Sequence, residues 1–438
     1  MNDATRKLAE KLAGSLFDMC VQEPELLRGW RAGFDRELLA LLRLAGVLFL
    51  ERWMTWENRR LVKQAKVDGY VVERSPKIKV LTVMGWVTVV SSYIRRSGDQ
   101  TGLRPLNTHF GLAGNQSTNA VQRAMTDFGM ERSFGDAAAA FEEHYGVAVG
   151  ATTVQNITER HAHRIQRELD EWYAQAPEPA REHRADRMIL GMDGCCLRVT
   201  ERVTAGRLGR SDLPADRPVR VDRWVDTRLA KARREGDATG VFVCQHASFE
   251  DVLQALEGAA RRRGRTAETE LVFLGDGGNG LMEAAIKRFP QAHFVLDRLH
   301  LRQHLYEVVR HIGTVEHAVE HLVDVFDTVI GRGDAWWVIL ELRALVPARK
   351  RAKAVESCPI TNLIGYLERF ANCIRYDDFE RRGWPTGSGE IESGHRQVPQ
   401  ARLKLPGAAW TVANLNAMAA TRAARESGLW KQFWPKAA

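Results

Sequence analysis

The sequence predicts an α/β protein, in which a mixed sheet with flanking helices is interrupted by an all-α insertion and preceded by a mostly helical region. Three observations predict this class. Short apolar runs ending in aspartate alternate with helical stretches between residues 186 and 300. Residues 301–385 look wholly helical, and residues 1–68 carry apolar positions at helical spacing. The length of 438 residues also predicts two to four domains.

The composition is that of an ordered globular protein, with 45% hydrophobic and 27% charged residues. The longest apolar run, at residues 45–50, is too short to cross a bilayer, and no signal-peptide pattern opens the chain. The six cysteines form no CxxC pair, which argues against a zinc ribbon or a disulfide framework. We therefore expect a cytoplasmic protein.

The chain is basic, with 63 Lys and Arg against 55 Asp and Glu and a net charge of +8. Such an excess suits a polyanionic partner, because phosphate contacts by Lys and Arg release counterions. Many soluble proteins are basic without such a partner, so charge alone leaves both interpretations open. If the partner is DNA, the bound protein is expected to associate with the nucleoid.

Residues 1–77 are expected to form an N-terminal helical region. Its apolar positions recur at helical spacing among many Arg and Glu residues: Leu38, Leu39, Leu41, Leu42, Leu48 and Leu50.

Residues 78–175 are expected to combine a β-hairpin with helices in a DNA-binding region. Residues 78–95 alternate and are rich in β-branched side chains, with Gly85 at the centre, which predicts the hairpin. Two later stretches have the proportions of a helix-turn-helix, at 134–146 and 152–169. An ordinary helical hairpin is an equal alternative. A linker follows near 175–186, marked by Pro177 and Pro179.

The predicted core, residues 186–300, contains strands that end in aspartate. The run MILGMDG predicts a strand ending at Asp193, ELVFLGD a strand ending at Asp276, and HFVLD a strand ending at Asp297. Residues 195–203 and 217–225 are expected to supply a second strand and an irregular, Arg-rich connection.

Two further elements complete that core. Residues 240–244 predict another strand, and Ser248 is expected to cap a helix that runs to Arg263, with Asp251 in the capping-box position. After the helical insertion 301–385, the segment GWPTGSGEIES opens a helix carrying Glu390 and Glu392, within a last region that covers 386–438. A meander followed by alternating helices and strands is the order found in the RNase H fold, although order alone does not establish that fold.

Asp193 and Asp276 are the expected ligands of a divalent metal. Neighbouring strand ends converge, so two carboxylates placed there can face one metal pair. Mg²⁺ prefers oxygen ligands and usually takes one or two protein carboxylates beside phosphate and water. Two such ions can activate the attacking oxygen and stabilise the leaving one. A third carboxylate on a helix crossing the sheet would complete the site, with Glu392 as first candidate and Glu390 as second.

Each of these motifs has a simpler interpretation. A single Asp-Gly after a strand is usually a turn, and Glu390 can merely favour a helix N-terminus. Asp297 and His300 are expected to form a hydrogen-bonded pair that supports the site without holding metal. The segment GDGGNG also has the form of a dinucleotide-binding fingerprint, with glycines at 275, 277 and 280. Against that fingerprint, Asp276 would repel a pyrophosphate inside the loop.

Taken together, MDG, LGDGGNGLMEAAIKRFPQAHFVLDRLH, SGEIES and HRQVPQARLK resemble bacterial insertion-sequence transposases of the Mutator-like superfamily. In that family an Asp-Asp-Glu triad does the chemistry and a (C/D)xxH motif follows the second Asp. Carried over by motif, the triad falls on Asp193, Asp276 and Glu392, and the added motif on Asp297 and His300. The family's helical insertion corresponds to residues 301–385.

The resemblance implies an RNase H-like catalytic core and Mg²⁺ as cofactor, with Mn²⁺ as a substitute. It implies hydrolysis that frees a 3′-hydroxyl at the transposon ends, followed by attack of that hydroxyl on target DNA. The partners it implies are double-stranded DNA, as terminal inverted repeats and as target, and a homodimer or higher oligomer. Many relatives carry a Cys pair where Arg95, Arg96 and Ser97 stand here, so the family's N-terminal zinc module is not expected.

Two basic clusters are expected to bind DNA. From residue 393 onward the tail carries a net charge of +6, from Glu426 and seven basic residues: Arg396, Arg402, Lys404, Arg422, Arg425, Lys431 and Lys436. Of these, Arg396, Arg402 and Lys404 follow the proposed catalytic Glu and are the first candidates. The second cluster is Arg261, Arg262 and Arg263. For both clusters the alternative is a solvated surface, and the tryptophans at 410, 430 and 434 are expected to lie in the core.

Two other functions share these features. An RNase H-like nuclease or resolvase would have the acidic site without strand joining. A non-catalytic, repurposed DNA-binding protein would keep the basic surfaces and lose nothing when the triad is changed.

Overall fold

The computed structural model describes residues 2–23, 25, 33–112, 116–278, 280–346 and 358–434. The chain forms two compact units, one made of Met1–Gly129 with Phe134–Ile157 and the other of Met130–Ser133 with Thr158–Ala438. The division falls inside helix α7 (Ala151–Ala174), so the expected linker at 175–186 lies within the second unit. No helix in the described part of the chain is both long and apolar enough to cross a membrane.

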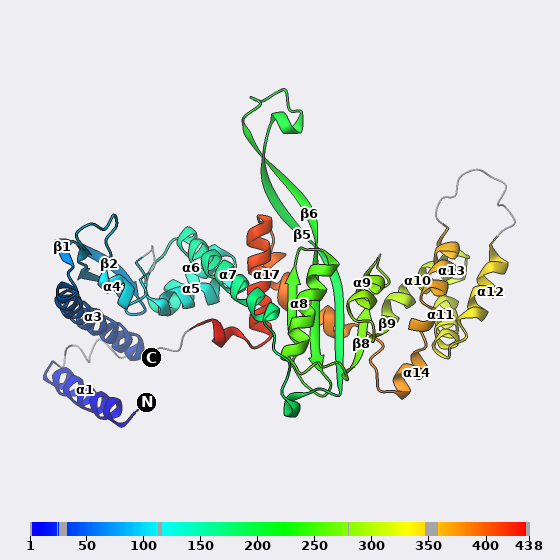
Figure 1. The fold of residues 1–438 in the computed structure, drawn as a ribbon, viewed down its shortest axis with the longest axis horizontal. Coiled ribbons are helices and arrows are strands. Elements are labelled where there is room, and N and C mark those ends of the chain that lie inside the picture. The colour runs from blue at the N-terminus through cyan, green and yellow to red at the C-terminus, as the bar shows by residue number, and fades with distance from the viewer. Residues whose placement is uncertain are drawn as a thin grey trace. The chain divides into compact units, whose positions relative to one another are not determined.

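The first unit contains helices and two small antiparallel sheets (Figure 1). Its first elements are α1 (Asp3–Gln22), α3 (Phe34–Val67), β1 (Val71–Arg74), β2 (Lys77–Thr82), β3 (Gly85–Val90) and β4 (Tyr93–Arg95). The predicted hairpin is present, because β2 pairs with β3 from Lys77–Val90 to Thr82–Gly85. Gly85 has φ +137°, a conformation that side-chain-bearing residues rarely adopt, so glycine suits this turn.

Helices complete the first unit as the sequence predicts. They are α4 (Pro105–His109), α5 (Asn119–Glu131), α6 (Phe134–Tyr145) and the start of α7. Phe141 of α6 is fully buried and shares a core with Met125, Val154 and Ile157. The helix-turn-helix candidate therefore corresponds to α6 and α7, joined through residues 146–150.

The second unit is built on a five-stranded mixed sheet in the order β7-β6-β5-β8-β9 (Figure 1). The strands are β5 (Arg187–Thr204), β6 (Pro218–Arg234), β7 (Val241–Gln245), β8 (Glu270–Gly275) and β9 (His293–Leu296). The first three form an antiparallel meander, and β8 and β9 run parallel to β5. A mixed sheet with a meander at its start is what the sequence predicts.

Strand β5 differs from the prediction, because it does not end at Asp193. Its parallel pairing with β8 stops at Met192–Gly275, but its antiparallel pairing with β6 continues to Thr204–Pro218. Residues 195–203 thus belong to β5 and residues 218–225 to β6, and the irregular connection between the two strands lies at 205–217. The apolar run in the sequence ends where β8 stops pairing with β5. Strand β6 continues to pair with β5 beyond that point.

The helices expected between the strands are α8 (Phe249–Arg262), α9 (Leu281–Arg288) and α10 (Arg298–His311). Ser248 caps α8 as predicted, because its hydroxyl accepts a hydrogen bond from the backbone N–H of Asp251 at 3.1 Å. Fully buried side chains from the sheet, such as Leu190, Phe273 and Val295, form the core with these helices.

The insertion after α10 is helical throughout the described residues; its segment 347–357 lies outside them. It contains α11 (Glu316–Gly331), α12 (Ala335–Leu345), α13 (Pro359–Arg369) and α14 (Tyr376–Arg381). The chain then returns to the sheet as α15 (Gly389–His395), a π-helical turn (Arg396–Gln400) and α16 (Ala401–Leu403). A further helix, α17 (Val412–Glu426), follows and packs on β7.

Candidate metal-binding site

Asp193 and Asp276 line one cavity at the end of the sheet where β8 finishes. The cavity has a volume of about 380 Å³ and is also lined by Cys195, Asp226 and Arg228. Asp276 follows β8 directly, as predicted, whereas Asp193 lies within β5 one residue past the last pair with β8. The sequence placed both carboxylates at the same edge, and the structure brings them to one cavity.

The two carboxylates have different electrostatic surroundings. Burial raises the pKa of Asp276, the negative charge of Asp193 raises it further, and a hydrogen bond from the backbone N–H of Gly278 opposes both effects. That bond reaches Oδ1 at 3.1 Å, while Oδ2 has no partner among the described residues. A half-buried carboxylate with an unused oxygen beside a second negative charge is a group that a hard cation would stabilise.

Asp193 is held by its own backbone and by a buried histidine. Its Oδ1 accepts a hydrogen bond from Gly194 N at 2.7 Å, and its Oδ2 lies 3.3 Å from Nε2 of His395. His395 is 4% exposed, and neither of its ring nitrogens has an aligned hydrogen bond among the described residues. Burial alone would raise the pKa of Asp193, but the contact with His395, the hydrogen bond from Gly194 N and the nearby His300 together bring the pKa below its ordinary value.

Asp297 and His300 form the hydrogen-bonded pair that the sequence predicts. The buried carboxylate of Asp297 caps α10 by accepting from Leu299 N at 2.8 Å, and it also accepts from Ser388 Oγ and contacts His300 Nδ1 at 3.0 Å. Burial would raise the pKa of Asp297, but the bonds from His300 and Ser388 lower it. With its oxygens occupied in this way, Asp297 holds α10 and the start of α15 together.

The Asp297–His300 pair predicts a pH-dependent stability. The hydrogen bond to Asp297 raises the pKa of His300 above 6.5, and the charges of Asp276 and Asp193 add to this effect. A raised pKa means that the folded state holds the proton more tightly, so this stabilisation is complete below pH 6.5 and is lost as pH rises through the folded pKa. We expect His300→Asn to lower the free energy of unfolding more at pH 6 than at pH 8.5, as urea denaturation at both pH values would measure. An equal loss at both would contradict the pairing.

Helix α15 lies close against the sheet, and two glycines allow the approach. A Cβ added to Gly191 of β5 would lie 3.0 Å from Ile391 Cγ1, and one added to Gly394 would lie 2.7 Å from Phe242 Cε1. Ile391, Gly394 and His395 form the buried side of the helix. This packing fixes where the other side chains of α15 project.

Glu390 is anchored to strand β6. Its carboxylate forms ion pairs of 2.8 Å with both Lys231 and Arg233. Burial would raise the pKa of Glu390, but these two cations lower it. Both oxygens are thus engaged, and the residue fastens α15 across β6.

Glu392 is exposed and is not among the residues that line the cavity. Its backbone N–H bonds Ser388 O at 3.0 Å, so it lies one turn after Ser388 and one turn before His395. Those two residues contact Asp297 and Asp193, but the carboxylate of Glu392 itself contacts neither aspartate among the described residues. In the described part of the chain no group of three or more His, Cys, Asp or Glu side chains is placed to hold a metal ion. The structure therefore brings two predicted ligands together and leaves the third outside the cavity.

Three residues near the site were missed by sequence reasoning. His395 and Ser388 lie one turn on either side of Glu392, and this spacing was the signal available in the sequence. Tyr366 comes from the helical insertion, and a Cβ added to Gly277 would lie 2.2 Å from its ring. No sequence pattern links Tyr366 to the loop after β8. Its ring occupies the space above the proposed dinucleotide fingerprint, which counts further against a pyrophosphate there.

The basic tail is only partly exposed, which corrects the expectation for Arg402. Its side chain is 3% exposed, stacks on Trp410 at 4.7 Å and is too buried to contact DNA in this structure. Arg422 is also buried and pairs with Glu131 and Glu426. Arg396 and Lys404 are exposed and remain DNA-binding candidates. Trp410 and Trp434 are buried as expected, Trp430 is partly buried, and Lys436 lies outside the described residues.

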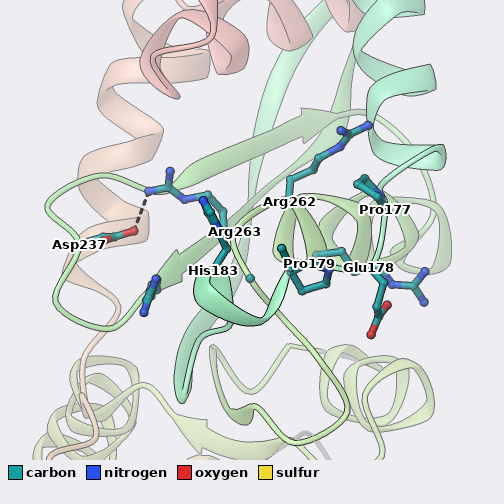
Figure 2. Close-up of a pocket in the computed structure, with 11 residues that line it drawn as sticks. Pro177, Glu178, Pro179, His183, Asp237, Arg262 and Arg263 are labelled. Atoms are coloured by element: carbon teal, nitrogen blue, oxygen red, sulfur yellow. Dashed lines mark hydrogen bonds and ion pairs between the residues drawn. The ribbon is translucent and has the colours of Figure 1, made fainter.

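Arg261, Arg262 and Arg263 lie at the other end of the sheet, where β5 begins, beside a cavity of about 540 Å³ (Figure 2). Arg263 pairs with Asp237 at 2.8 Å, and Arg261 pairs with Glu257 at 2.9 Å. Arg262 donates to Trp172 O at 2.9 Å. Each guanidinium is already bonded within the unit, an arrangement that favours a structural role.

No protein-family model and no curated protein matches the chain. Among solved structures, it is similar to the Drosophila P element transposase strand transfer complex, with 8% identity, 71% of this chain and 79% of that chain covered, and a TM-score of 0.26. A likeness at this TM-score establishes neither the fold nor the function.

Proposed function

We propose that this chain is a DDE-type DNA transposase that cleaves DNA at the ends of an insertion sequence and joins those ends to target DNA. The observation that carries the proposal is the meeting of Asp193 and Asp276, from two neighbouring strands, in one cavity. Helix α15, which carries Glu392, packs against β5 and β6 beside them. The motifs around these residues resemble those of Mutator-like insertion-sequence transposases.

The strand order supports an RNase H-like core for this reaction. An antiparallel meander, β5 to β7, is followed by two parallel strands with intervening helices, and a helix bearing the third acid returns to the sheet. That is the order expected of the RNase H fold with an all-α insertion before its last acidic helix. This core resembles the RNase H fold in the order of its strands and helices and in the positions of Asp193, Asp276 and Glu392 along that order.

The residues present fit a divalent cation. Asp193 and Asp276 supply hard oxygen ligands, and Asp276 Oδ2 is unused among the described residues. Two protein carboxylates match what Mg²⁺ usually takes when phosphate and water complete its shell. When bound, Mg²⁺ or Mn²⁺ would activate the attacking oxygen and stabilise the charge on the leaving oxygen.

The remaining residues of the site orient those ligands. His395 faces one oxygen of Asp193, which leaves the carboxylate with a fixed direction. Asp297, with Ser388 and His300, ties α10 to the start of α15. Glu390 holds α15 on β6, so Glu392 projects from an anchored helix and would join the ligands once DNA occupies the cavity. Preorganisation of this kind is how a phosphoryl-transfer site stabilises developing charge.

The test uses a plasmid that carries the genomic DNA flanking this reading frame, incubated with purified protein and Mg²⁺. We expect strand breaks at the boundaries of flanking inverted repeats and, when a target plasmid is added, joined products that sequencing can locate. Cleavage without joining would instead indicate an RNase H-like nuclease or resolvase. Binding without cleavage would indicate a non-catalytic DNA-binding protein.

A further inference from the structure

Strands β5 and β6 continue well beyond the sheet as a two-stranded ribbon (Figure 1). Pairing of β5 with β8 ends at Met192, and pairing of β6 with β7 ends at Arg228. Past these points β5 and β6 pair with each other as far as Thr204 and Pro218. We call residues 195–227 the ribbon. At about 3.3 Å per residue, each strand projects roughly 30 Å.

The two faces of the ribbon differ in chemistry. Directly opposite residues of an antiparallel pair point to the same side, and successive residues alternate between sides. One side, here called the arginine face, carries Arg198, Thr200, Arg202, Arg220, Asp222 and Trp224. The other side carries Val199, Glu201, Val203, Val219, Val221 and Arg223.

The arginine face has a surplus of positive charge that the protein does not neutralise. Of its two acids, Asp226 at the base pairs with Arg228 at 2.9 Å, whereas Asp222 pairs with Arg198 and also with Arg220, the latter at 3.3 Å. Arg202 is exposed, lies directly opposite Arg220, and has no hydrogen bond or ion pair among the described residues. Like charges placed directly opposite are unfavourable in a sheet. An anion on this face would relieve that repulsion.

The end of the ribbon adds further exposed cations. Arg207 and Arg217 are exposed, and neither side chain has a bonding partner among the described residues. Trp224 is 68% exposed and lies opposite Arg198 on the arginine face. Guanidinium groups suit phosphates, and an apolar ring beside them can pack against sugars and base edges.

The ribbon begins at the candidate metal site. Cys195 and Asp226, at its base, line the cavity with Asp193 and Asp276. Cys196 and Asp226 belong to the arginine face and line that cavity, so a duplex with one phosphate in the cavity would lie beside this face. The DNA major groove is about 12 Å wide and accepts a two-stranded β-ribbon.

We propose that the arginine face of the ribbon binds duplex DNA next to the metal site. The inference rests on the proposed function for the reaction carried out on that DNA, while binding itself follows from the ribbon's charge and shape. The main DNA contact then lies on the ribbon, a segment that the sequence predicted only as a second strand and an Arg-rich connection.

The test compares two double variants that lose the same charge. Arg202→Gln with Arg220→Gln alters the ribbon, and Arg181→Gln with Arg184→Gln alters exposed arginines before β5 at the far end of the sheet. Fluorescence anisotropy with a labelled duplex of mixed sequence would give Kd over a series of salt concentrations. We expect the ribbon variant to bind about tenfold or more weaker, with the slope of log Kd against log salt reduced by about 1.8, for two lost phosphate contacts. The control should change little.

Three results would overturn the inference. The first is an unchanged Kd and salt slope in the ribbon variant. The second is an equal loss of DNA affinity in the control variant. The third is unchanged DNA binding with altered self-association in sedimentation velocity, which would assign the ribbon to contact with a second copy of the chain. Arg202→Lys keeps the charge and should bind close to wild type, which separates lost charge from misfolding. If wild-type protein binds DNA through the ribbon but cleaves none, the proposed reaction fails and this inference stands.

Discussion

Replacing Asp193 or Asp276 by asparagine is expected to reduce Mg²⁺-dependent DNA cleavage about a thousandfold or more. Both carboxylates line the same cavity, and asparagine removes the negative charge while keeping the shape. A thousandfold corresponds to about 4 kcal/mol of lost transition-state stabilisation, at 1.36 kcal/mol per tenfold. Single-turnover cleavage of the flanking-DNA plasmid would measure the loss.

Asp226→Asn is the matched control for that experiment. Asp226 lines the same cavity but is half exposed and pairs with Arg228 at 2.9 Å. We expect cleavage within about tenfold of wild type, because a single ion pair of this exposure contributes little. Cleavage retained in Asp193→Asn or Asp276→Asn would remove that residue from the proposed ligands.

Glu392→Gln and Glu390→Gln are expected to have opposite effects on activity and stability. Glu392 is exposed and is the proposed third ligand, so its loss should reduce cleavage about a hundredfold or more without changing the free energy of unfolding. Glu390 pairs with Lys231 and Arg233, whose side chains are largely buried, so its loss should cost about 1 to 3 kcal/mol of stability and leave most of the activity.

Parallel cleavage assays and urea denaturation would measure both variants. The reverse pattern, with activity lost only in Glu390→Gln, would make Glu390 the third ligand. If both variants keep their cleavage activity, Asp193 and Asp276 would carry the chemistry without a glutamate.

The parts of the fold that the sequence predicts are those governed by local pattern. β-branched alternation predicts the β2–β3 hairpin, and apolar runs followed by helical periods predict β8 and β9 with Asp276 and Asp297 at their ends. The cap at Ser248 depends on residues three positions apart and is equally local. The structure of these elements is decided by residues that lie close to one another in the sequence.

The parts that the sequence does not predict depend on partners far along the chain. β5 continues past Asp193 because β6 pairs with it there, although the apolar run has already ended. An arginine in a basic tail is expected at the surface, but packing on Trp410 buries Arg402. His395 reaches Asp193 only because α15 returns to the sheet after the whole helical insertion.

Binding of Mn²⁺ in the absence of DNA tests the metal site most directly. Isothermal titration calorimetry of wild type, Asp193→Asn and Asp276→Asn would separate the site from any effect on DNA. We predict saturable binding by wild type and at least about tenfold weaker binding by each variant, since each loses a charged oxygen ligand. Because burial and Asp193 raise the pKa of Asp276, wild-type affinity should fall as the pH is lowered toward that pKa. Equal Mn²⁺ affinity in all three proteins would contradict a metal site at Asp193 and Asp276.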